Sequence, residues 1–292
     1  MSAEHPIIAV TGSSGSGTTL SRRIFSKLFE DLGLNAAFVE GDSFHAYDRE
    51  QMRTVLQRAQ IRGENFSHFG PEANQFARLE ALFRDYGAGG SGTVRRYLHT
   101  DAEAREARQA PGSFTPWAPL AEGTDVLFYE GLHGGVVTGE CDVAQHVDLL
   151  VGMTPTVNLE WIQKIRRDTD ERGYDADEVA RTILRRMPDY MKYIAPQFSR
   201  TDVNFQRVPL VDTSNPFVLQ DIPGHAESLL VVHLNPGGRI PVDFDSLLAD
   251  VEGAFLSRPD TLVVPGEQMP EAMERVLRPA LERFATRKAA AK

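Results

Sequence analysis

The stretch HPIIAVTGSSGSGTTLSRRIF, residues 5–25, combines an apolar run, a glycine-rich turn and the start of a helix. Residues 7–10 are apolar and mostly β-branched, which is typical of a buried parallel strand. Residues 20–32 have a helical pattern. Glycines allow backbone N–H groups to converge on an anion, and a helix N-terminus adds unpaired donors and the positive end of its dipole. The stretch therefore predicts a phosphate-binding strand–turn–helix unit.

The turn matches the Walker A pattern G-x-x-x-x-G-K-[ST] at all positions except one. Gly12 and Gly17 occupy the glycine positions, and Thr19 offers a hydroxyl to Mg²⁺, but Thr18 replaces the lysine. Charge on the nucleotide phosphates must then be balanced by cations elsewhere in the chain. The predicted nucleotide-binding residues are Gly12, Ser13, Ser14, Gly15, Ser16, Gly17, Thr18 and Thr19.

Composition predicts an ordinary globular protein of the cytoplasm. The chain has 292 residues, of which 41% are hydrophobic and 25% charged, and its formal net charge is −10. An acidic chain without a basic stripe argues against nucleic-acid and membrane-surface partners. The single cysteine, Cys141, excludes an intramolecular disulfide and suits a reducing compartment. The first strand begins almost at once, and no targeting segment is evident.

Apolar runs and helical patterns alternate along the chain, which predicts an α/β sandwich with a largely parallel sheet. Residues 62–122 break this alternation and are predicted to be an insertion within one domain that spans residues 1–292, because ordinary connections are much shorter. Further strands are expected at residues 36–40, 93–99, 125–129, 147–153, 205–211, 229–234 and 261–264. Helices are expected at residues 48–60, 69–84, 101–108, 156–172, 178–195 and 271–287.

Two acidic residues follow predicted strands and suggest phosphoryl transfer. Asp42 comes after strand 36–40 and Glu130 after strand 125–129, so both belong at the carboxyl edge of the sheet, where ligands of open α/β sheets bind. Asp42 is positioned to act as general base on an acceptor hydroxyl, and Glu130 with Thr19 to hold Mg²⁺. A helix cap for Asp42 and an exposed strand end for Glu130 are the plainer interpretations.

Basic side chains near these acids complete the expected chemistry. Lys164, Arg167 and Arg172 lie on one predicted helix and are candidates to replace the missing lysine or to close over the site, although a solvated helix face has the same pattern. His45 and Arg49 follow Asp42 closely. They are suitable donors for a phosphorylated acceptor.

In these segments the chain resembles phosphoribulokinases of the bacterial type. The matching segments are IIAVTGSSGSGTT, VEGDSFH, FSHFGPEAN, FYEGLHGG, NLEWIQKIRRDTDERG and PQFSRTDVNFQRVPLVDTSNPF. The family signature K-x-x-R-D-x-x-x-R-G is present as Lys164, Arg167, Asp168, Arg172 and Gly173. Bacterial members of the family also lack the Walker A lysine.

The resemblance implies a P-loop kinase fold of the uridine kinase type, with a largely parallel but mixed sheet and flanking helices. It implies ATP-dependent phosphorylation of the C1 hydroxyl of D-ribulose 5-phosphate and assembly as a homo-oligomer. The roles that it transfers to this sequence are catalysis by Asp42, Lys164, Arg167 and Asp168, sugar-phosphate binding by His45, Arg49 and Arg172, and Mg²⁺ binding by Thr19, Glu130 and Asp168.

Other functions stay open at this point. A related P-loop kinase could act on another small hydroxyl acceptor, such as uridine or pantothenate. A nucleotide-binding paralogue with a regulatory role is a second alternative, although the predicted catalytic acids are all present. A GTPase-like switch lacks support because neither N-K-x-D nor D-x-x-G is found in place.

Overall fold

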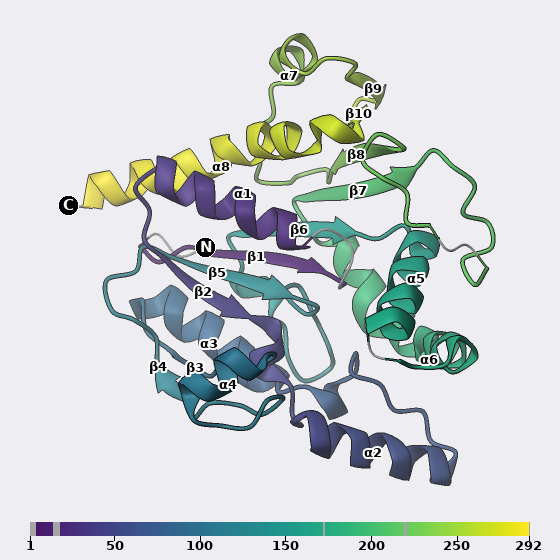
Figure 1. Ribbon diagram of the computed structural model, residues 1–292. Helices are drawn as coiled ribbons and strands as arrows, with labels where there is room; N and C mark the ends of the chain where they lie inside the picture. Colours follow the sequence, from purple (N-terminus) through teal and green to yellow (C-terminus); the bar gives the residue numbers. More distant parts are fainter. Residues whose placement is uncertain (1–3, 14–17, 172, 219–220, 292) are drawn as a thin grey trace.

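The centre of the molecule is an eight-stranded sheet with the strand order β2-β5-β1-β6-β7-β8-β10-β9 (Figure 1). The computed structural model describes residues 4–13, 18–171, 173–218 and 221–291, without the side chains of Thr18, Thr19, Glu171 and Ala291. The strands are β1 (Ile7–Gly12), β2 (Ala36–Glu40), β5 (Val126–Gly131), β6 (Leu149–Thr154), β7 (Val203–Pro209), β8 (Ser228–Leu234), β9 (Phe255–Arg258) and β10 (Thr261–Pro265).

The sheet is parallel from β2 to β7 and antiparallel beyond. In the parallel part, β1 lies between β5 and β6, so the chain leaves β1 for the glycine-rich turn from the middle of the sheet. A parallel sheet gathers the carboxyl ends of its strands at one edge, which is the usual place for ligands. The predicted fold class, an α/β sandwich around a largely parallel but mixed sheet, is confirmed.

Helices cover both faces of the parallel part of the sheet. Helices α1 (Thr18–Asp31) and α8 (Met269–Ala291) lie side by side on one face, and α3 (Phe76–Gly89) covers the other (Figure 1). Helices α5 (Val157–Arg166) and α6 (Ala176–Asp189) stand beside the carboxyl ends of the strands. The remaining helices are α2 (Arg49–Arg62), α4 (Asp101–Ala107) and α7 (Phe244–Asp250).

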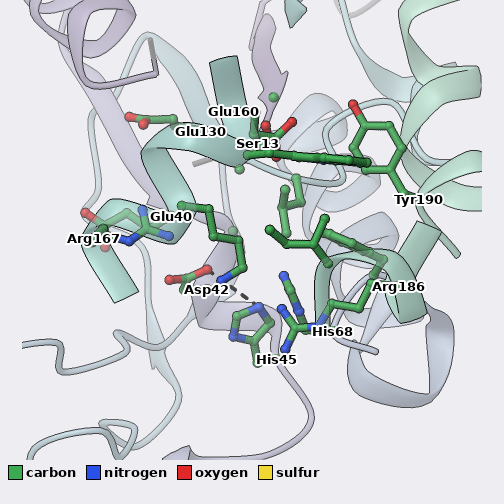
Figure 2. A pocket seen from close by; sticks show the side chains of 18 of the residues that line it. Ser13, Glu40, Asp42, His45, His68, Glu130, Glu160, Arg167, Arg186 and Tyr190 are labelled. Carbon is green, nitrogen blue, oxygen red and sulfur yellow. Dashed lines mark ion pairs between the residues drawn. The ribbon is translucent and has the colours of Figure 1, made fainter. Parts of the chain in front are cut away.

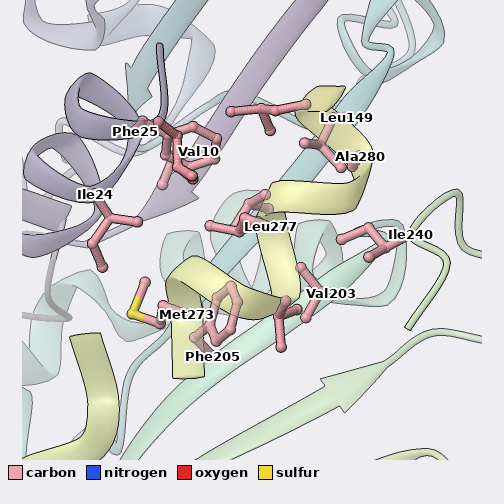
Figure 3. Close-up of a cluster of buried hydrophobic side chains, with 14 of the residues drawn as sticks. Val10, Ile24, Phe25, Leu149, Val203, Phe205, Ile240, Met273, Leu277 and Ala280 are labelled. Carbon is pink, nitrogen blue, oxygen red and sulfur yellow. The ribbon is translucent and has the colours of Figure 1, made fainter. Parts of the chain in front are cut away.

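Alternate side chains of the central strands enter two different cores. Ile8 and Val10 of β1 point into the larger core, which α1 and α8 complete with residues such as Phe25 and Leu277 (Figure 3). Ile7 and Ala9 of the same strand point into the second core, which α3 covers. A strand that is apolar on both faces is the pattern of a parallel sheet covered on both sides, so the local sequence of β1 agrees with its central place.

The segment of residues 62–122 contributes α3 to the second core. It then forms a two-stranded antiparallel pair of β3 (Thr93–Val94) and β4 (Ala118–Pro119), and α4 lies in the connection between these two strands. The predicted strand 93–99 is wrong beyond its first two residues, because the chain continues only through an isolated bridge between Tyr97 and Phe114. The helix predicted from residue 69 begins at residue 76, after a 3₁₀ turn at Pro71–Ala73.

Helices α5 and α6 both continue into π-helical turns, η4 (Arg167–Glu171) and η5 (Tyr190–Ile194). π-helical turns are rare and occur frequently at functional sites. The turn η4 follows Lys164 within the predicted signature. Among the described residues, no helix combines the length and the apolar character that crossing a membrane requires.

Candidate active site

A cavity of about 610 Å³ lies at the carboxyl edge of the parallel strands, between the ends of β1, β2 and β5 and the helices α5 and α6. It is the place where the sequence predicted the ligand. Its lining includes predicted site residues from several elements: Gly12, Ser13, Asp42, His45, Glu130, Lys164 and Arg167. Gly12 and Ser13 of the predicted nucleotide-binding turn therefore line the same cavity as the two acidic residues.

Asp42 lies in the 3₁₀ turn η1 (Gly41–Phe44), directly after β2. Its two carboxylate oxygens face two imidazoles, with Oδ1 3.5 Å from Nε2 of His45 and Oδ2 3.5 Å from Nε2 of His99. Burial lowers the pKa of His45 despite the opposing attraction of Asp42. A neutral imidazole with a depressed pKa leaves the Asp42 carboxylate without a full ion pair, which suits a proton acceptor.

Two glycines bring Asp42 and Glu130 close to each other. A Cβ atom on Gly41 would lie 2.9 Å from the Cα of Gly131, and one on Gly131 would lie 2.7 Å from the Cα of Gly41. Only glycine allows the backbones of β2 and β5 to approach so closely at these positions. The predicted base and the predicted metal carboxylate are thereby placed on adjacent strand ends.

Glu130 is a suitable partner for a Mg²⁺ ion that also binds nucleotide phosphates. It stands opposite Val10 in the register of β5 with β1, just before the glycine-rich turn. Within the described residues, no group of three or more His, Cys, Asp or Glu side chains forms a complete metal cage. Mg²⁺ at nucleotide sites is usually held by one or two carboxylates with phosphate and water oxygens, and this donor set fits that pattern.

Helix α5 presents cations to the cavity. Lys164 and Arg167 line the cavity. Asp168 is 5% exposed and forms an ion pair with Lys164, which lies four residues earlier. Arg167 Nε also lies 3.6 Å from Asp168 Oδ1. Burial lowers the pKa of Lys164, and Asp168 opposes that effect. The ion pairs with Asp168 thus fix the positions of the Lys164 and Arg167 side chains.

The comparisons with known proteins show the family and the fold. The family model described as "Phosphoribulokinase / Uridine kinase family" matches residues 7–214. The chain belongs to this family. A "Probable phosphoribulokinase" of Escherichia coli K12 is 56% identical over 97% of this chain and 98% of its own length. The plasmid-encoded phosphoribulokinase of Cupriavidus necator H16 is 53% identical over 99% and 98%.

Among solved structures, the chain is similar to the phosphoribulokinase from Rhodobacter spheroides, with a TM-score of 0.90 and 43% identity. The match covers 99% of this chain and 100% of that one. The prediction of a phosphoribulokinase-type kinase is therefore confirmed for the family and for the fold. The individual site residues stay predictions.

Some predicted site residues lie away from the cavity or outside the described part. Arg49 is exposed at the start of α2 and does not line the cavity, although its Nη2 donates a hydrogen bond to the carbonyl of His99, 3.2 Å away. Ser14, Gly15, Ser16, Gly17 and Arg172 lie outside the described residues, as do the side chains of Thr18 and Thr19. Their roles rest on the sequence alone.

Sequence reasoning missed two basic groups at one end of the cavity. Figure 2 shows Arg186 of α6 beside His68, both on the same side of Asp42 as His45. Arg186 Nε is shielded from solvent and has no hydrogen-bond partner among the described residues. Burial lowers the pKa of Arg186 to about 10, and burial also lowers the pKa of His68 well below its usual value. This end of the cavity is suited to an anion.

Glu160 of α5 was also missed and lies at the opposite end, near Ser13 (Figure 2). Burial raises the pKa of Glu160 to about 6, although the hydroxyl of Ser13 and the charges of Lys164 and Arg167 oppose the rise. In the sequence, Glu160 and Arg186 look like ordinary polar positions of amphipathic helices. The helical spacing of three and four residues from Glu160 to Lys164 and Arg167 was the only available signal.

Proposed function

We propose that this chain is a phosphoribulokinase, which transfers the γ-phosphoryl group of ATP to the C1 hydroxyl of D-ribulose 5-phosphate. One observation carries the proposal: Asp42 lies in a single cavity between two different ends. One end is formed by Gly12 and Ser13 of the predicted P-loop, and the other by His68 and Arg186. A kinase for a phosphorylated acceptor needs both ends, because two phosphorylated substrates must meet at the base.

The nucleotide is assigned to the end formed by Gly12 and Ser13. The residues from Gly12 to Thr19 would hold its phosphates through backbone N–H groups and the N-terminus of α1. Glu130 and Thr19 would hold Mg²⁺, with Asp168 as the second carboxylate that the family resemblance implies. When bound, Mg²⁺ neutralises charge on the phosphates and orients them for in-line transfer.

Asp42 acts as general base in this proposal. Its carboxylate takes the proton of the C1 hydroxyl as that oxygen attacks the γ-phosphorus atom. The bond between the γ-phosphorus and the bridging oxygen breaks, and ADP leaves. Lys164 and Arg167, which line the cavity, stabilise the charge of the transferring group in place of the missing P-loop lysine.

The acceptor's own phosphate is assigned to the basic end of the cavity. His45 and Arg186 line this end, and Arg49 and Arg172 are the predicted residues that would complete it. Arginine binds phosphate in a bidentate geometry. Uridine has no anionic group for Arg186 to bind, and pantothenate has a carboxylate but no phosphate, so the buried guanidinium of Arg186 favours a sugar phosphate.

The experiment that tests the proposal measures ADP release from Mg·ATP with D-ribulose 5-phosphate, uridine and pantothenate as separate acceptors. Selective turnover of ribulose 5-phosphate is the expected result, and the Asp42→Asn variant controls for contaminating ATPase. Turnover of uridine or pantothenate alone would assign the cavity to a different acceptor. Binding of ATP without turnover of any acceptor would favour the regulatory paralogue.

Assembly as a homo-oligomer and a cytoplasmic location belong to the same proposal, because the family resemblance implies the first and the single cysteine supports the second. Light scattering of the purified chain tests the assembly. A mass equal to that of one 32.4 kDa chain at micromolar concentration would contradict it.

A further inference from the structure

Arg95 connects the segment of residues 62–122 to the turn that carries Asp42. It follows β3, and its guanidinium carbon lies 3.5 Å from the ring centroid of Phe114 and 4.8 Å from that of Trp117. Stacking on aromatic rings leaves the edge of a guanidinium free to donate hydrogen bonds. Arg95 uses this edge on backbone carbonyls, with Nε 2.9 Å from the oxygen of Ser43 and Nη2 2.5 Å from that of His45.

These two carbonyls lie on the C-terminal side of Asp42, that of Ser43 within the turn η1 and that of His45 at its C-cap. The last carbonyls of a short helical turn have no partner within the turn itself, and a cation at this end is favoured by the direction of the peptide dipoles. Gln75 assists, because its backbone N–H donates to the oxygen of Phe44 at 2.7 Å. Residues 43–45 are therefore held by donors from Gln75 and Arg95, which lie 31 to 52 residues further along the chain.

The position of the Asp42 carboxylate depends on this turn. Asp42 side-chain atoms are 42% exposed, and the carboxylate reaches the two imidazoles only at 3.5 Å. Such contacts are too long to fix the carboxylate as strong hydrogen bonds would. The backbone of η1, and hence Arg95, must supply the orientation.

We propose that Arg95 is a positioning residue for phosphoryl transfer, which holds the turn η1 so that Asp42 faces the acceptor between His45 and His99. The inference rests on the proposed function, since it takes Asp42 as the base. Misplacement of a reacting group by about 1 Å can lower a rate about 100-fold. Methionine keeps an apolar stem against the rings of Phe114 and Trp117 and removes the two hydrogen bonds to the turn, so Arg95→Met affects the position of the turn more than the packing of the segment.

The test compares Arg95→Met, Arg95→Lys and the control Arg96→Met. Lysine keeps the charge and the apolar stem but offers one donor group without the planar fork. Arg96 is the next residue, and its side chain is exposed. We expect kcat to fall about 10- to 100-fold in Arg95→Met and less in Arg95→Lys, with an unchanged Kd for ATP, and no change in Arg96→Met. An unchanged kcat in Arg95→Met would overturn the proposal.

A double-mutant cycle separates positioning of Asp42 from a general structural role. If Arg95 acts through Asp42, then Arg95→Met should have little further effect on the residual turnover of Asp42→Asn. An equal fold-loss in both backgrounds would contradict the proposal, because it would show that Arg95 acts independently of the base.

Hydrogen exchange of the amides of residues 41–46 gives a readout that does not depend on the acceptor. Arg95→Met should exchange faster there than the wild-type chain, whereas Arg96→Met should not. This measurement keeps the two proposals distinguishable. A wild-type chain that does not turn over ribulose 5-phosphate would contradict the proposed function, and unchanged exchange in Arg95→Met would contradict the role of Arg95.

Discussion

Asp42 is held by few direct contacts for a residue with a central role in the proposed reaction. Its carboxylate faces His45 and His99 at 3.5 Å and is open to the cavity. We expect Asp42→Asn to lower kcat about 100-fold or more, the usual effect of losing a general base, with a nearly unchanged KM for ATP. Steady-state ADP release at saturating acceptor measures this change.

Asp48→Asn provides the matched control for Asp42→Asn. Asp48 is the N-cap of α2, where its side chain accepts a hydrogen bond from the N–H of Gln51. Asparagine is about as good an N-cap as aspartate, so this variant should keep both stability and turnover. Near-normal kcat in Asp42→Asn would remove Asp42 from the role of base.

Glu160 makes the stability of the fold depend on pH. Its pKa is raised to about 6 by burial, above the ordinary value of 4.5. Between pH 4.5 and about 6, the Glu160 carboxyl is ionised in the unfolded chain but still largely protonated in the folded chain. The free energy of unfolding therefore falls as the pH rises from about 4.5 to about 6. The loss is about 2 kcal/mol and is complete above the folded-state pKa. We expect Glu160→Gln to be more stable than the wild type at pH 8 by up to this amount.

Urea unfolding of Glu160→Gln and of the wild type at pH 5 and at pH 8 measures this difference. The stabilisation should be much smaller at pH 5, where the Glu160 carboxyl is largely protonated in the folded chain. Glu106→Gln, at an exposed position of α4, controls for the removal of one surface charge. A stabilisation of equal size at the two pH values would show that Glu160 ionises as freely in the folded chain as in the unfolded one.

Local sequence patterns were sufficient to predict the strands and helices whose own residues show a clear apolar pattern. The strand predicted at residues 36–40 is confirmed to the residue as β2, and the long C-terminal helix is found at Met269–Ala291. The π-helical turns η4 and η5 were not predicted, because the hydrophobic spacing of an α-helix continues into them. The strand β9 was missed for a different reason: it has only four residues, and its two apolar residues, Phe255 and Leu256, make too short a run to indicate a strand.

Gln197 joins three elements around the cavity through one amide. It is 0% exposed, and its Nε2 donates to the oxygens of Leu132 and Tyr193, both at 2.8 Å. Its Oε1 accepts from the hydroxyl of Thr11 and from the N–H of Gly135, both at 2.9 Å. The end of β1, the loop after β5 and the turn η5 are thereby tied together.

Gln197→Leu should therefore destabilise the chain by about 3 kcal/mol. Leucine would leave the N–H of Gly135 and the oxygen of Tyr193 buried without this partner, and each such loss costs about 1–3 kcal/mol. The hydroxyl of Thr11 keeps its second acceptor, the oxygen of Leu132, at 3.1 Å. The measurement is the urea unfolding midpoint, with Gln60→Leu on the exposed side of α2 as control. A loss below about 1 kcal/mol would mean that water replaces the amide.

The parts of the candidate site that could be predicted are the acidic residues at strand ends and the basic face of one helix, where Lys164 and Arg167 line the cavity. Asp42 and Glu130 lie at the same edge of the sheet because the carboxyl ends of parallel strands are gathered there. This rule can be applied to the sequence alone. Arg186 lies on α6 and Arg95 directly follows β3. No local sequence pattern predicts contacts between residues so far apart in the chain. Arg95 lies in the segment of residues 62–122 and hydrogen-bonds to carbonyls about 50 residues earlier. That this segment is an insertion stays a prediction.

We propose that residues 1–292 form one domain and unfold as one unit. The strands β1, β5 and β6 contribute to both cores, with Ile8 and Val10 in the larger core and Ile7 and Ala9 in the second. Neither core can lose its order without exposing the other face of the same strands. Helix α8 also returns to α1, where Arg278 pairs with Asp31 at 2.6 Å, so both ends of the chain belong to the same core.

Two variants that create a cavity test whether the chain unfolds as one unit. They are Leu277→Ala in the larger core and Leu79→Ala in the second. Each leucine is almost fully buried, so each change should cost about 2–5 kcal/mol. Both variants are made in a Trp161→Phe background, because the chain has two tryptophans and the fluorescence must report Trp117 alone. In one cooperative domain, either variant lowers the urea midpoint of the whole chain, and far-UV circular dichroism and the fluorescence of Trp117, which packs against the second core, follow the same curve. If Leu277→Ala moved only the circular dichroism signal and left Trp117 unchanged, the two cores would unfold separately and the chain would contain two domains.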